Sequence, residues 1–422
     1  MAIKPRTKGK TYSSRSVGSQ WFNRLGFKQN KYGTCKFLSI ITAFVFILYF
    51  FSNRFYPISR SVGASYSPSH GLYINEIPAS SRLIYPHVEH VPVLKQMTVR
   101  GLYITRLEVD GSKRLILKPE ENALTDEEKK KTTDQILLVK HSFLDHGKLV
   151  YRKSNDAPEV VVVTLIDFEN YELETIIQIV QNRVDYAQKH QYGVYIRWIQ
   201  EFLPVLENQN LAESYEFIKP LVIRAAMHAF PTAKYIHFVD QDALLMNLDL
   251  SLQKYLLDPK IMDLALLKNV PVVANSNIKT YNHFEYSSAK IIIPHDADGN
   301  IDASSFVIAN DFYGKALIDY LNDPLLRNFP WDNTGDKLSA AIGHILQWHP
   351  TLLGKTAIVI PKVLASQYDA SLGQEGESGN GASNGDVYHY NEGDLAASFK
   401  GCRSRGTCAS EIGHMYQKIK KS

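Results

Sequence analysis

The first 75 residues contain no acidic side chain, although nine Lys and Arg precede Phe37. Residues 37–422 carry 38 of the 47 basic residues and all 43 acidic ones, so the rest of the chain has no surplus of positive charge. A dedicated nucleic-acid binder needs such a surplus to neutralise phosphates, and that class is excluded. A hydrophobic content of 45% also excludes a mainly disordered chain.

Cysteine is scarce, and Asn-x-Ser/Thr sequons are absent, so no N-glycosylation of this chain is expected. Cys35 lies in the basic N-terminal part, which leaves Cys402 and Cys408, six positions apart. In an oxidising compartment such a pair can close a small loop, and we expect a disulfide there. Two free, partly buried thiols are the alternative.

One long hydrophobic run stands out, FLSIITAFVFILYFF from Phe37 to Phe51, between Lys36 and Arg54. It predicts a single membrane anchor over residues 37–55. A cleaved signal peptide is the competing interpretation, but the basic leader is long and no small-residue cleavage site follows. The positive charges predict a cytosolic tail over 1–36, with the remainder in the lumen as in a type II protein.

Residues 56–155 are predicted to form a stem or subdomain. Apolar and polar residues alternate around Asp110-Gly111, which indicates a β-hairpin. Thr125 and Glu128 form a capping box ahead of the apolar positions Ile136, Leu137 and Val139, which indicates a helix. The segment either spaces the main domain from the membrane and contacts partners, or packs on that domain.

From Val160 onward, strand and helix patterns alternate, as in an α/β sheet of Rossmann type. The run VVVTLI suits a strand buried on both faces. Further patterns predict helices at 173–187 and, opened by a proline, at 220–230. They also predict strands at 194–199, 235–239, 272–274, 291–293, 306–308 and 357–360. Five glycines between Gly373 and Gly385 indicate a loop, since no Lys-Ser/Thr follows to make it a phosphate-binding loop.

The sequence contains two Asp-x-Asp pairs, and their positions distinguish them. Asp240 and Asp242 follow the predicted strand YIHFV, at the sheet edge where ligands of α/β folds collect. Two carboxylates there can bind Mg²⁺ or Mn²⁺, which can bridge the diphosphate of a sugar nucleotide. A helix cap at the strand end is the alternative. Asp296 and Asp298 lie in a predicted turn, and Val307 stands where a calcium loop needs a glutamate.

Five stretches over residues 155–415 resemble the fungal Golgi galactosyl/mannosyltransferases, glycosyltransferase family 34. They are NRVDYAQKHQY, FIKPLVIRAAMHAFPTAKYIHFVDQDAL, SSFVIAN, HPTLLGKTAIVIPK and GDLAASFKGCRSRGTC. The resemblance implies a GT-A type domain over 156–415, anchored in the Golgi membrane with its catalytic part lumenal. It also implies retaining α-1,6-mannosyl transfer from GDP-mannose to the mannan backbone of N-glycans, with manganese (or magnesium) as the metal. Other mannosyltransferase subunits of a Golgi mannan polymerase complex are the implied partners.

The resemblance also nominates site residues. Asp240 and Asp242 are the metal ligands and, with Asp167 after the first strand, the residues that contact the donor. Asp336 and Asp302 occupy positions of active-site residues, although Asp336 can also be read as a helix N-cap.

This chain departs from the family pattern at Ser398, which takes the place of a metal-binding histidine in the closing motif. Asp302, Ser304 and Ala309 replace residues of a second family motif. His389, His237 or a water could complete a metal site instead. These departures leave a catalytically weak structural subunit as the alternative function. A metal phosphohydrolase is a third hypothesis, which no nucleophile or third carboxylate near DQDAL supports.

Overall fold

The computed structural model describes residues 82–111, 113–117, 127, 131–145, 157–205, 211–331, 336–368 and 387–421. All of these belong to the second of two units into which the chain divides, residues 62–422. Within the described residues no helix is long and apolar enough to cross a membrane. The predicted anchor at 37–55, the capping box of Thr125 and Glu128, and the Gly373–Gly385 loop lie outside the described residues.

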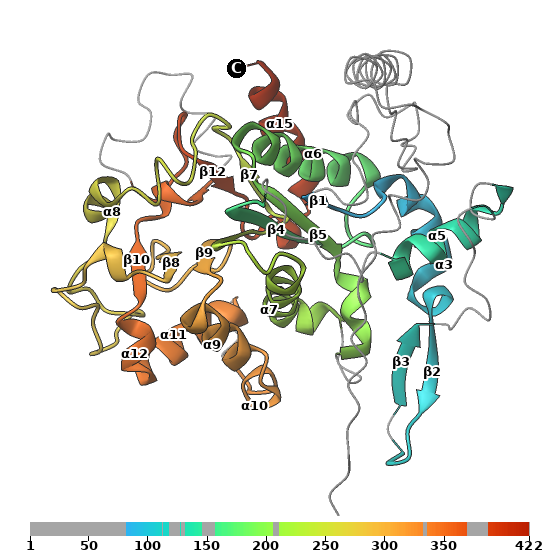
Figure 1. Ribbon diagram of the computed structural model, residues 1–422, viewed down its shortest axis with the longest axis horizontal. Coiled ribbons are helices and arrows are strands. Elements are labelled where there is room, and N and C mark those ends of the chain that lie inside the picture. Colours follow the sequence, from blue (N-terminus) through green and yellow to red (C-terminus); the bar gives the residue numbers. More distant parts are fainter. Residues whose placement is uncertain are drawn as a thin grey trace, which may run out of the picture. The chain divides into compact units, whose positions relative to one another are not determined.

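A seven-stranded mixed sheet forms the centre of the fold, as the α/β prediction requires (Figure 1). Its parallel strands are continuous apolar runs because both faces are buried. β9 runs antiparallel to both of its neighbours, so the sheet is not purely parallel. In spatial order the strands are β1 (Leu83–Ile84), β5 (Gly193–Trp198), β4 (Val160–Ile166), β6 (Tyr235–Val239), β9 (Ser305–Ala309), β8 (Ile291–Pro294) and β10 (Thr356–Val359).

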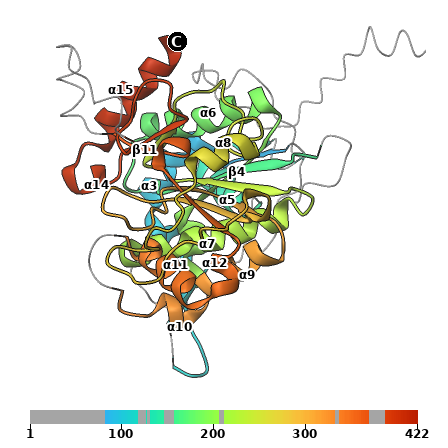
Figure 2. The same cartoon turned by 90° about the vertical axis from the view of Figure 1, so that its left-hand side faces the viewer.

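Helices cover both faces of this sheet, and the two perpendicular views agree on their sides (Figures 1 and 2). α6 (Leu173–His190) and α15 (Cys408–Lys421) lie on one side. The other side carries α7 (Leu211–Ala229), α9 (Phe312–Leu321), α10 (Pro324–Arg327), α11 (Lys337–Trp348) and α12 (Pro350–Leu353). The buried apolar side chains of strands and helices form one continuous core between these layers.

A small second sheet lies beyond the carboxyl end of β6. Its strands, in spatial order, are β11 (Ser366–Gln367), β12 (Ala396–Ser398) and β7 (Ala243–Leu245). β12 pairs antiparallel with β7, which brings the C-terminal part of the chain beside the residues that follow β6. The short helix α14 (Cys402–Arg405) continues from this sheet toward α15.

Residues of the predicted stem contribute to the same fold. β1 pairs with β5 in the main sheet, and the buried Tyr103 hydroxyl donates a hydrogen bond to the carbonyl of Gln200. The predicted hairpin is present as β2 (Tyr103–Leu107) and β3 (Lys113–Leu117). The apolar positions Ile136, Leu137 and Val139 lie in a helix as predicted, α5 (Gln135–Asp145), but it begins after Asp134, which caps it, and not at Thr125. The helix α3 (Val91–Leu102) precedes the hairpin.

One predicted strand is wrong, and one predicted helix is present but begins earlier than expected. No strand forms at 272–274, because Pro271 bridges to Lys279 and the segment closes on itself as a loop. The helix expected at 220–230 begins at Leu211, with Pro220 in its interior. Tyr215, Phe217 and Ile218 are buried ahead of that proline, and their packing outweighs the hydrogen bond that the proline cannot donate. The remaining described elements are α8 (Pro259–Ala265) and short 3₁₀ turns at Val88–His90, Ile199–Val205, Tyr286–Ser288 and Pro361–Val363.

Candidate active site

Asp240 lies directly after β6, at the edge where the parallel strands β4 and β6 both end. It is buried, and its backbone N–H donates to the carbonyl of Ser304, 2.8 Å away, at the start of β9. Because β9 is antiparallel, its first residues arrive at the edge where the parallel strands end. The sheet topology thereby brings the segments after β4 and β6 and before β9 to one place.

The carboxylate of Asp240 is paired with a buried lysine. Lys219 Nζ lies 2.6 Å from Asp240 Oδ2 and 2.6 Å from a carboxylate oxygen of Glu216. The Tyr215 hydroxyl donates to Asp240 Oδ1 at 2.8 Å. Burial lowers the pKa of Lys219, but the nearby carboxylates of Asp240, Glu216 and Asp336 outweigh it and hold that pKa above its ordinary value. Lys219 is therefore a fixed positive charge in the interior.

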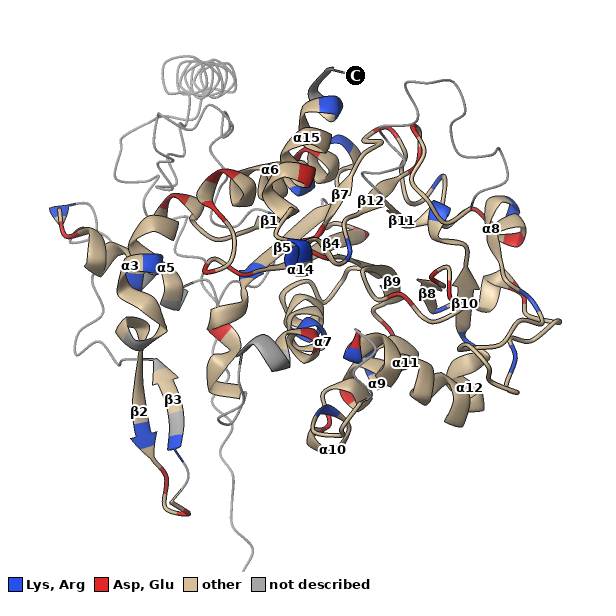
Figure 3. Ribbon diagram, turned by 180° about the vertical axis from the view of Figure 1, so that it is seen from behind, with Lys and Arg blue, Asp and Glu red and all other residues tan. Residues whose placement is uncertain are grey.

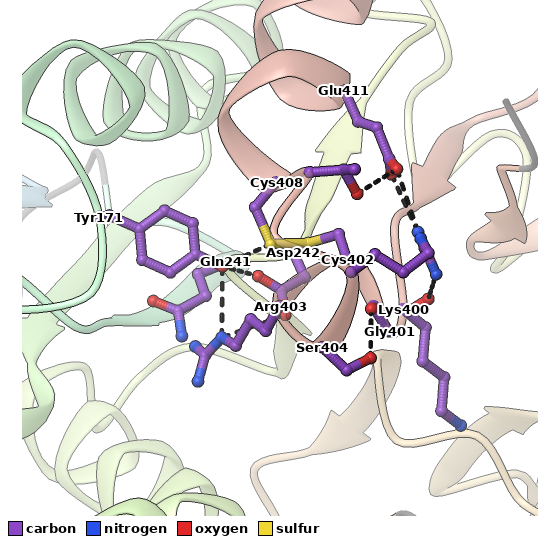
Figure 4. The surroundings of a disulfide bond; sticks show 12 residues. Tyr171, Gln241, Asp242, Lys400, Gly401, Cys402, Arg403, Ser404, Cys408 and Glu411 are labelled. Carbon is purple, nitrogen blue, oxygen red and sulfur yellow. Dashed lines mark hydrogen bonds and ion pairs between the residues drawn. A yellow bond between two sulfur atoms is a disulfide. The ribbon is translucent and has the colours of Figure 1, made fainter.

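Asp242 has weaker charge compensation than Asp240. Its carboxylate accepts a hydrogen bond from the Tyr171 hydroxyl, and Arg403 Nε lies 3.5 Å from its Oδ2 (Figure 4). Burial raises the pKa of Asp242 to about 6, although Arg403 opposes this shift. The Arg403 guanidinium lies over the Tyr215 ring, 4.4 Å from the ring centre. A carboxylate and a guanidinium thus meet here in a partly buried setting.

Two residues of the motif NRVDYAQKHQY, Asn182 and Arg183, bind the loop that follows β6. Arg183 of α6 is fully buried and donates to the backbone carbonyls of Asp240 and Ala243, at 2.8 and 2.5 Å. Asn182 exchanges two hydrogen bonds with the backbone of Leu245. These bonds satisfy buried carbonyls and fix the Asp240–Leu245 segment against α6.

Cys402 and Cys408 form a disulfide, with their Cα atoms 4.8 Å apart, immediately behind Asp242 (Figure 4). The Phe399 N–H donates to the carbonyl of Asp242 at 2.7 Å, which ties the same segment to the loop after β6. The disulfide and this bond place Arg403 beside Asp242. Arg403 belongs to α14, which Figure 3 shows as a basic helix.

Asp242, Cys402 and Cys408 are three potential metal-ligating residues within 4.8 Å of one another in the described part of the chain. Both sulfurs belong to the disulfide, so neither can ligate as a thiolate. Any cation here would have to be held by oxygen atoms.

The two predicted catalytic residues meet at one lysine. Lys400 Nζ lies 3.3 Å from Asp302 Oδ1 and 3.8 Å from Asp336 Oδ2. Asp336 is also the N-cap of α11, where its Oδ1 accepts the Ser339 N–H at 3.1 Å. Burial raises the pKa of Asp336, but Lys219, Lys400 and the bonds from Ser339 outweigh it and keep that pKa below its ordinary value. The capping role and the active-site position are therefore compatible.

Asp167 lies at the end of β4 and is buried. Its Oδ1 accepts hydrogen bonds from the Glu169 N–H at 3.0 Å and the Gln200 amide at 2.8 Å, and its backbone N–H donates to Gln241. The carboxylate thus holds the turn that follows β4. A contact with the donor stays a prediction for this residue.

Ser398 lies in β12 and is buried, and among the described residues its hydroxyl has no hydrogen-bond partner. His237, one of the alternative metal ligands, lies inside the sheet with Nε2 3.1 Å from the Ser305 hydroxyl. Burial and then the charge of Arg183 lower the pKa of His237 to about 3. It is therefore a neutral core residue.

Replacing His237 with Gln is expected to make folding less sensitive to acid. Below pH 6.5 the unfolded chain binds a proton at His237 that the folded chain does not bind, so stability falls as the pH falls. This residue alone should cost roughly 3 kcal/mol between pH 7 and pH 4. Denaturant titrations across this range should show a shallower decline for His237→Gln. The exposed His414→Gln is the matched control, and equal slopes for both variants would refute the assignment.

Lys219, Arg403, Lys400, Tyr171 and Tyr215 were missed by the sequence interpretation. For Lys219 the sequence does contain an indication, because it is a single lysine between apolar residues of a helix that precedes the Asp-x-Asp strand. Lys400 and Arg403 come from the C-terminal segment, whose proximity depends on the second sheet and the disulfide. Tyr171 follows β4 and Tyr215 lies in α7, so the main sheet and its helices position these two.

The sequence model of the galactosyl transferase GMA12/MNN10 family matches residues 156–409. This range contains the four aspartates Asp240, Asp242, Asp302 and Asp336 and the lysines and arginine that contact them. An uncharacterized alpha-1,2-galactosyltransferase of Schizosaccharomyces pombe, C8D2.17, is 25% identical over 303 residues, covering 66% of this chain and 81% of that protein.

The probable alpha-1,6-mannosyltransferase MNN10 of Saccharomyces cerevisiae is 21% identical over 254 residues, which cover 55% of this chain and 57% of that protein. Among solved structures, a glycosyltransferase involved in the glycosylation of the major capsid of PBCV-1 shares 14% identity. The TM-score of that match is 0.37, and it covers 62% of this chain and 100% of the other.

Proposed function

Because the chain belongs to the galactosyl transferase GMA12/MNN10 family and is therefore a glycosyltransferase, we propose that it transfers mannose from GDP-mannose. The proposed acceptor is the α-1,6-mannan backbone of N-linked glycans, and the proposed reaction retains the α configuration within a GT-A type domain. Similarity to a probable alpha-1,6-mannosyltransferase supports the choice of mannose. The observation that carries the proposal is the gathering of Asp242, Arg403, Lys219, Asp302 and Asp336 at the carboxyl edge of the sheet.

The donor set at this edge suits a hard divalent cation. Asp242 offers a partly buried carboxylate, and Arg403 Nε lies 3.5 Å from it, so its charge is incompletely compensated. Asp240 would be the second ligand, in competition with Lys219. When bound, Mn²⁺ or Mg²⁺ would neutralise the charge of the departing GDP.

The chain's own cations support the same step. Arg403 presents a guanidinium beside Asp242, where a bidentate contact with a diphosphate is possible once a ligand enters. Lys219 contributes a fixed positive charge behind Asp240. Together they favour the negative charge that develops on the leaving group.

Asp302 and Asp336 are the residues proposed to act on the sugar. Lys400 and the Ser339 bonds favour the ionised form of Asp336, and a carboxylate near the anomeric carbon stabilises the positive charge of an oxocarbenium-like transition state. Lys400 also orients Asp302, which has a further bond from the Ser304 hydroxyl at 3.0 Å.

The proposal includes a Golgi location through the anchor predicted at 37–55, with the catalytic domain in the lumen. It also includes assembly with other mannosyltransferase subunits of a mannan polymerase complex. A catalytically weak structural subunit is the second candidate function. It is favoured by the Asp240 carboxylate, whose two oxygens already bind Lys219 and Tyr215.

The experiment is a donor panel with the purified full-length chain, alone and in its complex. GDP release from GDP-mannose should require an α-1,6-linked mannose oligosaccharide and should stop when EDTA removes the divalent cation. Linkage analysis should identify α-1,6 products. Use of UDP-galactose in preference to GDP-mannose would overturn the choice of donor, and a complex that turns over without this chain would favour the structural subunit.

A further inference from the structure

The carboxylate of Asp240 has two contacts within the protein that compete with its proposed role as a metal ligand. Oδ1 accepts a hydrogen bond from the Tyr215 hydroxyl, and Oδ2 lies 2.6 Å from Lys219 Nζ. A divalent cation and an ammonium repel each other, so the two cannot hold the same carboxylate oxygen at full strength. Cation binding at Asp240 therefore requires another partner for Lys219.

Glu216 is in the position to be that partner. It lies three residues before Lys219 on α7, where side chains of a helix are neighbours. Its Oε2 is 2.6 Å from Lys219 Nζ, the same distance as Asp240 Oδ2. Within the described part of the chain that oxygen is buried and accepts no hydrogen bond of good geometry. It can therefore accept one from the ammonium.

The other neighbours of Lys219 also tolerate a shift away from Asp240. Its Nζ lies 5.3 Å from the centre of the Tyr215 ring and 5.9 Å from that of Phe238, and aromatic faces attract a cation. An ammonium carries three N–H donors on a flexible stem. A small rotation at the end of the side chain can thus move its bonds from Asp240 to Glu216 without moving α7 or β6.

This contact does not require one particular charge on Glu216. Burial raises the pKa of Glu216 to about 8, although Lys219 opposes the shift. A protonated carboxyl group still accepts a hydrogen bond, and so does the amide oxygen of glutamine. Methionine has a similar length and only a weak acceptor. Substitution by Gln or by Met therefore separates the acceptor at this position from the volume of the side chain.

We propose that Glu216 is a positioning residue for the cation site, which receives Lys219 when a divalent cation takes the Asp240 carboxylate. This inference rests on the proposed function, in which Asp240 is a metal ligand, and deepens it. Glu216 does not touch the cation and acts only through Lys219. Without an acceptor at position 216 the buried ammonium would keep its hold on Asp240, because a buried charge without a partner is costly. The cation would then bind more weakly.

The test measures Mn²⁺ binding by the full-length protein, without nucleotide or sugar, from the EPR signal of the free ion. For Glu216→Met we expect the Kd for Mn²⁺ to rise about 10-fold or more, as for the loss of one hydrogen bond to a charged group. For Glu216→Gln the rise should stay below about 3-fold, because the amide oxygen still accepts from Lys219. Glu174→Met, at an exposed position of α6, is the matched control and should bind Mn²⁺ as the wild type does.

Thermal unfolding separates this role from a merely structural one. In EDTA Lys219 keeps its contact with Asp240, so the Tm of Glu216→Met should stay close to that of the wild type. The rise in Tm that Mn²⁺ causes should be smaller in this variant than in the wild type. A lower Tm in EDTA together with an unchanged Kd for Mn²⁺ would make Glu216 a structural residue and overturn the inference.

The outcomes also separate this inference from the proposed function. Weaker Mn²⁺ binding in Glu216→Met, with near-normal binding in Glu216→Gln, supports it even if the chain uses another donor or turns over slowly. Equal Kd values for the wild type and both variants would overturn it, even where GDP release from GDP-mannose depends on the cation. A wild type that binds no Mn²⁺ at millimolar concentration would overturn it too, since Lys219 would then be the permanent partner of Asp240.

Discussion

The substitution Asp242→Asn is expected to lower mannosyl transfer by about 100-fold or more while leaving the protein folded. The substitution keeps the shape of the side chain and removes the negative charge that would bind a cation at the leaving group. Loss of one electrostatic contribution of this kind typically costs 10²–10³ in kcat. Turnover of GDP-mannose with an α-1,6-mannose oligosaccharide is the measurement.

The stability of this variant distinguishes a functional from a structural role. Burial raises the pKa of Asp242 to about 6, so at pH 7 the fold opposes the ionised form. Asp242→Asn should therefore leave the Tm at pH 7 unchanged or raise it. Such a result is typical of functional residues, whose side chains lower the stability of the fold. The Asp263→Asn variant is the control for a carboxylate at the surface. Turnover within twofold of the wild type in an intact complex would exclude a catalytic role for this carboxylate.

The substitution Lys219→Met is expected to destabilise the protein by about 3–5 kcal/mol, because it leaves Asp240 and Glu216 buried without their cation. For a domain of this size the Tm should fall by roughly 6–20 °C. Lys219 is 2% exposed, whereas the side chain of Lys234 is 68% exposed in its pair with Glu159. Lys234→Met should therefore change stability by less than about 1 kcal/mol.

A double-mutant cycle tests the pairing directly. Lys219→Met combined with Asp240→Asn should cost less than the sum of the two single variants, because the second change removes the charge that the first leaves unpaired. Thermal unfolding of the four proteins gives the coupling energy. Additive losses, or a Lys219→Met cost as small as that of Lys234→Met, would show that the buried pair does not act as a unit.

Local sequence patterns were sufficient for the strands that surround the site. The run ending at Ile166 and the segment Tyr235–Val239 are strands at the expected positions because each is mainly apolar and nearly all of its residues are buried. Their parallel pairing places Asp167 and Asp240 at one edge, as the Rossmann-type interpretation required. Where a segment is short and its partners are distant, the same reasoning failed, as it did for residues 272–274.

The neighbours of the carboxylates could not be predicted from spacing. Arg403 lies 161 positions after Asp242 in the chain and reaches it because β12 pairs with β7 and a disulfide fixes α14. Lys219 precedes Asp240 by a helix and a strand, and only the packing of α7 under the sheet turns its side chain toward that carboxylate.

By itself the sequence determined the α/β class, the strand that delivers Asp240 and Asp242, and the motifs that relate the chain to its family. Hydrophobic periodicity and motif spacing are local properties, so they can be read without knowing which segments meet. The tertiary structure alone decided which charges surround those carboxylates, because pairing between remote segments depends on the packing of the whole core. That packing joined Asp302 and Asp336 at Lys400.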